Sequence, residues 1–119
     1  MSVLDGKRIL VVEDEAIIAF ALEDMLDELG CVVVGPALRL EDACVLAVDS
    51  QLDGAILDVN LNSERSYPAA RTLAERGVPF IFATGYDRES LEWEGKVPDL
   101  IAKPYRKDQL EAALIRLLQ

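Results

Sequence analysis

Short apolar runs alternate with helical patterns along the whole chain. The runs are rich in β-branched residues and almost free of polar ones, which is typical of strands covered on both faces and favours a parallel sheet. The alternation of such runs with helical segments predicts an α/β domain. We expect strands over residues 8–12, 31–34, 55–57, 78–83 and 100–102.

The first two connections carry apolar residues at helical spacing. From Ile18 to Leu29 these residues recur every three or four positions, and Gly30 follows where a left-handed C-terminal cap is expected. A second helix is predicted over residues 40–47, although no Ser, Thr, Asp or Asn caps its start.

Two further helices follow the third and fifth predicted strands. Pro68 suits the first position of a helix that ends at Gly77. The last helix is expected to open at Asp108, with Glu111 three residues later in the spacing of a capping box.

Residues 86–97 have the weakest pattern of the chain. Acidic residues, Gly95 and the lone Trp93 interrupt any apolar stripe, and only Leu91 is expected to face the core. We therefore predict a short or mobile fourth helix here. Five strand–helix units with right-handed crossovers then form a doubly wound, flavodoxin-like fold with the parallel strand order 2-1-3-4-5.

Length, charge and composition exclude several classes of function. The 119 residues, of which 51% are hydrophobic, suffice for one domain spanning residues 1–119. The formal net charge of −10 disfavours nucleic acids and anionic membranes as partners. The sequence has no histidine, which excludes a Ser-His-Asp hydrolase, a His-liganded zinc site and a histidine phosphodonor. A metal site must therefore use oxygen ligands.

The two cysteines and the start of the chain indicate the cellular compartment of the protein. Cys31 and Cys44 stand among apolar residues, where a thiol behaves as a small hydrophobic group. No basic segment precedes an apolar run at the start, and no stretch approaches the roughly 18 apolar residues of a membrane span. We therefore expect a cytoplasmic protein.

Polar residues follow four of the predicted strands at their carboxyl ends. Glu13 and Asp14 come after the first strand, Asp58 after the third, Thr84 after the fourth and Lys103 after the fifth. In open α/β sheets the ligand crevice lies at these ends, where the strand order reverses. In the order 2-1-3-4-5 the first and third strands are neighbours, so we expect the three carboxylates to converge.

A cluster of three carboxylates beside one lysine predicts a cation and phosphate chemistry. The acids repel one another when no ion is bound, and the hard divalent ion that carboxylates and phosphate hold together is Mg²⁺. Asp58 is the candidate nucleophile for a phosphoryl group, whose charge Lys103 and the metal would spread while Thr84 donates to an oxygen.

Each of these residues also has a purely structural explanation. Asp14 is a favoured residue for capping a helix, and Asp58 suits a solvated loop in which Asn60 turns the chain. Lys103 suits an ordinary surface position, and Thr84 stands in common turn chemistry. Only their joint placement after four strands favours a functional site over these alternatives.

Four segments that follow one another along the chain are Ile9-Leu10-Val11-Val12-Glu13-Asp14-Glu15, Leu57-Asp58-Val59-Asn60-Leu61, Ala83-Thr84-Gly85 and Lys103-Pro104-Tyr105. In this order they resemble the signatures of a response regulator receiver domain of the CheY-like kind. The resemblance covers the whole chain and implies that Asp58 accepts a phosphoryl group from a histidine kinase or a histidine phosphotransfer protein. It further implies that Glu13, Asp14, Asp58 and the backbone carbonyl of Asn60 bind Mg²⁺, and that Thr84 and Lys103 contact the phosphoryl oxygens.

The resemblance also implies a cis bond before Pro104 and a narrower subfamily. Residues 79–86 are similar to the FATGUY-type single-domain receivers, which are associated with stress-response phosphorelays and with kinases of the HWE type. Glu13 stands where an Asp is more usual, which puts the metal affinity in question.

The residue that transmits the signal is a further departure from the common receiver pattern. Leu100 occupies the position of the usual switch aromatic, so the usual readout cannot operate there. We interpret Tyr86, two residues after Thr84, as the alternative switch; the other interpretation is that Tyr86 only covers the site. Amide shifts of Tyr86→Ala on phosphorylation would separate the two. Asn60 and Tyr86 are also expected to tune the phosphoryl lifetime.

The sequence thus predicts a stand-alone signalling receiver rather than an enzyme, with at most self-phosphorylation from small donors and slow self-dephosphorylation. We expect no output module after Leu118, and therefore output through a protein partner, or a role as a phosphate sink. One alternative is an interaction module with an idle pocket. The other is a small Mg²⁺-dependent phosphohydrolase, which would ordinarily carry a second Asp where this chain has Asn60.

Overall fold

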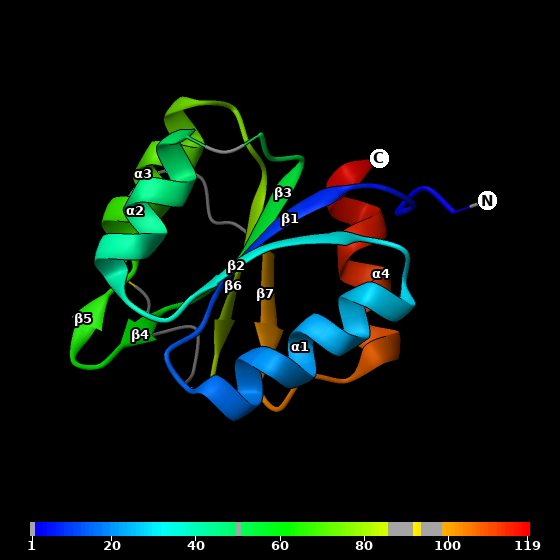
Figure 1. The fold of residues 1–119 in the computed structure, drawn as a ribbon, viewed down its shortest axis with the longest axis horizontal. Helices are drawn as coiled ribbons and strands as arrows, with labels where there is room; N and C mark the ends of the chain where they lie inside the picture. Colours follow the sequence, from blue (N-terminus) through cyan, green and yellow to red (C-terminus); the bar gives the residue numbers. More distant parts are fainter. Residues whose placement is uncertain (1, 50, 86–91, 94–98) are drawn as a thin grey trace.

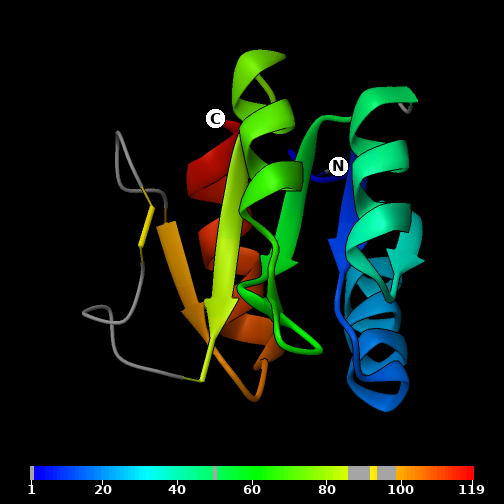
Figure 2. The same cartoon turned by 90° about the vertical axis from the view of Figure 1, so that its left-hand side faces the viewer.

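The fold is a sheet of five parallel strands between two layers of helices. The computed structural model describes residues 2–49, 51–85, 92–93 and 99–119. Figure 2 shows the strands side by side, from β7 at the left to β2 at the right, with their arrowheads pointing the same way. The order β2-β1-β3-β6-β7 confirms the predicted order 2-1-3-4-5. The strands are β1 (Arg8–Val12), β2 (Val32–Ala37), β3 (Gly54–Asp58), β6 (Phe80–Thr84) and β7 (Asp99–Ala102).

Helices cover both faces of the sheet. In Figure 1, α1 and α4 lie on one face, and α2 and α3 lie on the other. Their bounds are Ala16–Glu28 for α1, Leu40–Asp49 for α2, Tyr67–Glu75 for α3 and Lys107–Leu118 for α4. The helix labelled α4 is therefore the predicted last helix. The helix predicted over 86–97 lies outside the described residues, apart from Glu92 and Trp93. None of the helices in the described ranges has the length and apolarity to cross a membrane.

The ends of several elements differ from the prediction for local reasons. β6 starts two residues later than expected, because the N–H of Val78 donates to the carbonyl of Leu73 and closes α3, and Pro79 has no N–H. The capping box at Asp108 was wrong. Helix α4 begins at Lys107 without a side-chain cap, and Asp108 lies 3.6 Å from the guanidinium of Arg106 instead.

Alternation along the strands divides the core in two, which explains why the apolar runs are almost uninterrupted. Val11, Ile56 and Ile101 belong to the core under α1 and α4. Val12 and Leu57, neighbours of Val11 and Ile56 in the sequence, belong to the core under α2 and α3. Successive side chains of a strand point to opposite faces, so a strand covered on both sides must be apolar at every position.

An aromatic cluster ties α3 to the residues that precede β7. The ring of Trp93 lies 5.5 Å from Phe82, 5.6 Å from Phe80 and 5.9 Å from Tyr67, measured between centroids. The N–H of Glu92 donates to the hydroxyl of Tyr67 at 2.8 Å. The prediction that only Leu91 of this segment faces the core was therefore wrong, since Trp93 packs against the core. A single large side chain can reach the core without any helical period.

We expect Tyr67→Phe to lower the free energy of unfolding by about 1 kcal/mol, since it removes this hydrogen bond and leaves the ring packing in place. Urea unfolding followed by the fluorescence of Trp93 measures the change. Thr72→Ala, which removes an exposed hydrogen bond on the same helix, is the matched control and should change the stability by less than about 0.5 kcal/mol. Equal effects of the two variants would contradict the prediction.

Candidate functional site

The candidate site lies at the carboxyl ends of β1, β3 and β7. Glu13 and Asp14 follow β1, Asp58 is the last residue of β3, and Lys103 follows β7. One carboxylate oxygen from each of Glu13, Asp14 and Asp58 lies within 4.8 Å of the others. Because β1 and β3 pair directly, with Val12 opposite Leu57, the fold brings together acids that are 44 or 45 positions apart in the sequence.

Strand alternation explains why three of these side chains meet on one side of the sheet. Glu13 and Asp58 each come two residues after a side chain that packs under α1 and α4, namely Val11 and Ile56. Lys103 has the same relation to Ile101. Residues two apart along a strand point to the same face. Their side chains therefore converge where the strands end.

Lys103 bridges the two buried acids. Its Nζ lies 3.0 Å from Asp58 Oδ2 and 3.1 Å from Glu13 Oε2. Glu13 is fully buried, Asp58 is 5% exposed, and the side chain of Lys103 is 17% exposed. Lys103 is therefore neither a free surface lysine nor remote from the acids, and it offsets one of three carboxylate charges.

Burial and crowding shift the proton affinities of the site. Burial raises the pKa of Glu13 to about 7, and the nearby Asp58 adds to the rise, while Lys103 and the N–H of Glu15 oppose it. Burial lowers the pKa of Lys103, but its hydrogen bonds to Asp58 and Glu13, together with their charges, outweigh that effect, so the net shift is upward. The ammonium group thus stays charged, and Glu13 is held as a carboxyl that ionises with difficulty.

The acids retain capacity for a cation. Glu13 Oε2 is buried and completes no hydrogen bond within the described ranges of the chain, although it lies 3.1 Å from the charged Lys103 Nζ. Asp14 is half-buried and accepts a hydrogen bond from the N–H of Asn62 at 3.0 Å. Carboxylate oxygens in such an arrangement fit a hard divalent ion, which takes oxygen ligands and keeps several waters.

Asp14 and Asp58 do not have the structural roles that were open alternatives. The residue that precedes α1 as its N-cap is Glu15, and no side chain caps that helix, so Asp14 is not a cap. Asp58 is a buried strand residue rather than a solvated loop acid. Both observations leave the convergence of the carboxylates without a purely local explanation.

A hairpin next to the site was missed in the sequence. Strands β4 (Asn60–Leu61) and β5 (Glu64–Arg65) pair antiparallel. The turn between them has positive φ at Asn62 (47°) and Ser63 (73°), the backbone of a two-residue hairpin turn. Asn60 therefore starts a strand and does not turn the chain. The adjacent Asn62 and Ser63 were the available signal, but two-residue strands leave no readable period.

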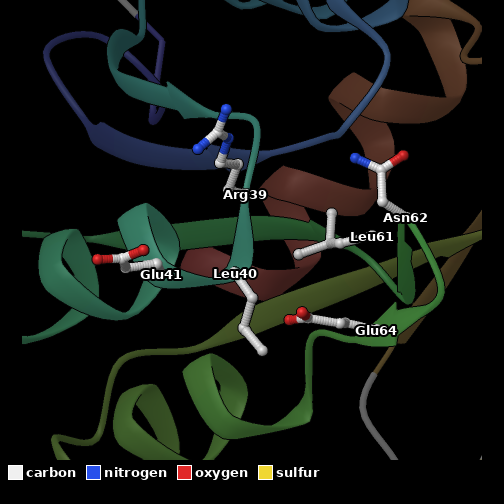
Figure 3. A pocket seen from close by; sticks show the side chains of 6 residues that line it. All are labelled: Arg39, Leu40, Glu41, Leu61, Asn62 and Glu64. Carbon is white, nitrogen blue, oxygen red and sulfur yellow. The ribbon is translucent and has the colours of Figure 1, made fainter.

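The hairpin also forms one wall of a pocket of about 230 Å³. Figure 3 shows that the other wall is the start of α2. Asn62 lines this pocket, and its N–H donates to Asp14, so it connects the pocket to the carboxylates. The pocket therefore lies beside the carboxylates and not over them. Its lining residues are Arg39, Leu40, Glu41, Leu61, Asn62 and Glu64.

The remaining predicted site residues lie around the ends of β6 and β7. Thr84 is the last residue of β6, and its carbonyl accepts the N–H of Lys103 at 3.2 Å. Leu100 is half-buried in β7 and pairs with Phe82 of β6. The peptide bond between Lys103 and Pro104 is cis, as the resemblance implied. Tyr86 lies outside the described residues.

The chain matches a known protein family over most of its length. The family model of the response regulator receiver domain matches residues 9–115. The phyllosphere-induced regulator PhyR of Methylorubrum extorquens is 35% identical over 115 residues, covering 93% of this chain and 43% of that protein. This chain therefore spans less than half the length of that relative.

Two solved structures are similar over nearly the whole chain. SdrG from Sphingomonas melonis Fr1 has a TM-score of 0.83 at 41% identity, and the match covers 100% of this chain and 100% of that one. The receiver domain of the sensor histidine kinase PA1611 from Pseudomonas aeruginosa PAO1 has a TM-score of 0.83 at 28% identity, covering 95% of this chain and 98% of that one. In that protein a magnesium ion is coordinated in the active site cleft. The chain thus belongs to the family of response regulator receiver domains, which are signalling domains of two-component systems.

Proposed function

We propose that residues 1–119 act as a receiver that accepts a phosphoryl group on Asp58 in the presence of Mg²⁺. The observation that carries the proposal is the convergence of Glu13, Asp14 and Asp58 within 4.8 Å, with Lys103 at 3.0 Å from Asp58. These carboxylates and the backbone carbonyl of Asn60 would hold the ion. When bound, it would supply positive charge that offsets the repulsion between the acids and an incoming phosphate.

Each side chain has a defined part in the transfer. A carboxylate oxygen of Asp58 forms a bond to phosphorus while the bond from phosphorus to the donor's histidine nitrogen breaks, and the imidazole leaves with that electron pair. Lys103, released from its bridge to Asp58, pairs with a phosphoryl oxygen, and Thr84 donates its hydroxyl to another. The donor is a histidine kinase, of the HWE type by analogy with FATGUY-type receivers, or a histidine phosphotransfer protein.

The biological role follows the likeness to SdrG and PhyR. Fold and identity support a FATGUY-type receiver in a stress-response phosphorelay, which passes its signal to a protein partner or drains phosphoryl groups from a shared kinase. The unpaired thiols of Cys31 and Cys44 suit the reducing cytoplasm, where such a kinase has its ATP.

Beryllofluoride, a mimic of the phosphoryl group, tests this function directly. With Mg²⁺ present, we expect amide shifts throughout β3, β6 and β7 of the wild-type protein, and none beyond those of Mg²⁺ alone in Asp58→Asn. Asp53→Asn, an exposed acid just before β3, is the control and should respond as the wild type does. A silent wild-type spectrum would favour an interaction module with an idle pocket. Steady turnover of a phosphate ester would favour a phosphohydrolase.

A further inference from the structure

Among the residues that the structure describes, two buried polar atoms next to the site complete no hydrogen bond. They are Glu13 Oε2 and the hydroxyl oxygen of Tyr105, which belongs to a residue only 8% exposed. Glu13 Oε2 has an ion pair with Lys103 Nζ at 3.1 Å, whereas leaving a buried hydroxyl such as that of Tyr105 unpaired costs about 1–3 kcal/mol. The proposed phosphoryl transfer accounts for Glu13 but assigns nothing to the hydroxyl of Tyr105.

The fold places these two groups on the same side of the sheet. Tyr105 packs in the core under α1 and α4, together with Val11 and Ile101. Glu13 comes two residues after Val11 and therefore points to that face. Tyr105 comes two residues after Lys103, whose Nζ lies 3.1 Å from Glu13 Oε2. A tyrosine hydroxyl is a hydrogen-bond donor as well as an acceptor, so that of Tyr105 can donate to a carboxylate on this face.

We propose that Tyr105 is a positioning residue whose hydroxyl donates to Oε2 of Glu13 and holds that carboxylate toward Asp14 and Asp58. Glu13 has one more rotatable bond than an aspartate, and its last torsion is soft. Lys103 Nζ and the N–H of Glu15 already contact this carboxylate. Without a further anchor at Oε2, it would still lose more rotational freedom when an ion binds. Groups that orient a metal ligand typically change metal affinity by about 10- to 100-fold.

The consequence for Mg²⁺ rests on the proposed function and is measured by titrating amide shifts with Mg²⁺. Tyr105→Phe, which removes only the hydroxyl, is expected to weaken Mg²⁺ binding about tenfold. In the background of Glu13→Asp, whose shorter side chain withdraws from Tyr105, the same substitution should change the affinity less than about twofold. Equal losses in the two backgrounds would overturn the proposal, because Tyr105 would then act independently of Glu13.

A second measurement on the metal-free protein decides the proposal without relying on Mg²⁺. The ¹³Cζ resonance of Tyr105 reports the hydrogen bonding of its hydroxyl. We expect it to move in Glu13→Asp and to stay in place in Asp14→Asn, the matched loss of a neighbouring carboxylate. If the resonance did not shift in Glu13→Asp, Tyr105 would not be the residue that positions Glu13. A wild-type protein that binds no Mg²⁺ would instead count against the proposed function. The ¹³Cζ resonance would still report whether Tyr105 contacts Glu13.

Discussion

The metal-free protein is expected to lose up to about 3 kcal/mol of stability between pH 5 and pH 8, and Glu13→Gln is expected to remove most of that loss. The cause is the fully buried carboxyl of Glu13, whose pKa is raised to about 7 by burial and by the charge of Asp58. A neutral amide of nearly the same shape has no proton to lose and therefore gives a flat profile.

The sign follows from where the proton is held. In the unfolded chain Glu13 ionises near its ordinary pKa of 4.5, whereas in the folded protein it keeps its proton up to about pH 7. Between these values the folded state binds more protons than the unfolded state, so stability falls as the pH rises. Below pH 4.5 both states are protonated and this contribution is constant; above pH 7 both are ionised and the loss is complete.

Urea unfolding at pH 5 and pH 8 with a chelator present measures the effect. Glu15→Gln, an exposed neighbour, is the control and should keep the slope of the wild type. Added Mg²⁺ should restore stability at pH 8 more than at pH 5, because it binds the ionised carboxylate. If Glu13→Gln kept the wild-type slope, the pH dependence would have to come from another group.

Lys103→Met is expected to have two effects of opposite sign. Without metal at pH 8, it should lower the free energy of unfolding by about 3–5 kcal/mol, since it leaves Glu13 and Asp58 buried without their counter-charge. At the same time it should tighten Mg²⁺ binding about fivefold or more, because a cation that competes for the same oxygens is gone. Both expectations rest on the distances of 3.0 and 3.1 Å from Lys103 Nζ to the carboxylates of Asp58 and Glu13.

Lys107→Met provides the matched control. Lys107 forms an ion pair of 2.7 Å with Glu28, and the two side chains are 50% and 61% exposed. Exposed pairs contribute only about 0–1 kcal/mol, so this variant should leave both stability and Mg²⁺ affinity nearly unchanged. Chemical denaturation and Mg²⁺ titration of both variants supply the comparison. Weaker Mg²⁺ binding in Lys103→Met would mean that the lysine helps to hold the ion's ligands instead of competing with it.

Particular residues show how much of the fold could be predicted from the sequence. The runs at Arg8–Val12 and 55–57 were readable as strands because a strand buried on both faces is apolar at each position. Gly30 and Gly77 were readable as helix ends, and both have positive φ (88° and 73°). Trp93 was misread because a single aromatic contact has no period. The capping box at Asp108 was misread because its spacing does not fix where the helix starts.

The sequence by itself determined the parallel strands, the helices between them and the set of polar residues at the strand ends, since these follow from local pattern. The order 2-1-3-4-5 was one of two common doubly wound orders, and the pairing of the strands decided it. Only the tertiary structure decided how these residues meet. It bridged Glu13 and Asp58 through Lys103, attached the hairpin turn at Asn62 to Asp14, and buried the hydroxyl of Tyr105. Such contacts depend on the face of the sheet to which each side chain points and on how far it is buried from water. Both are set by packing between segments far apart in the chain, so no local pattern records them.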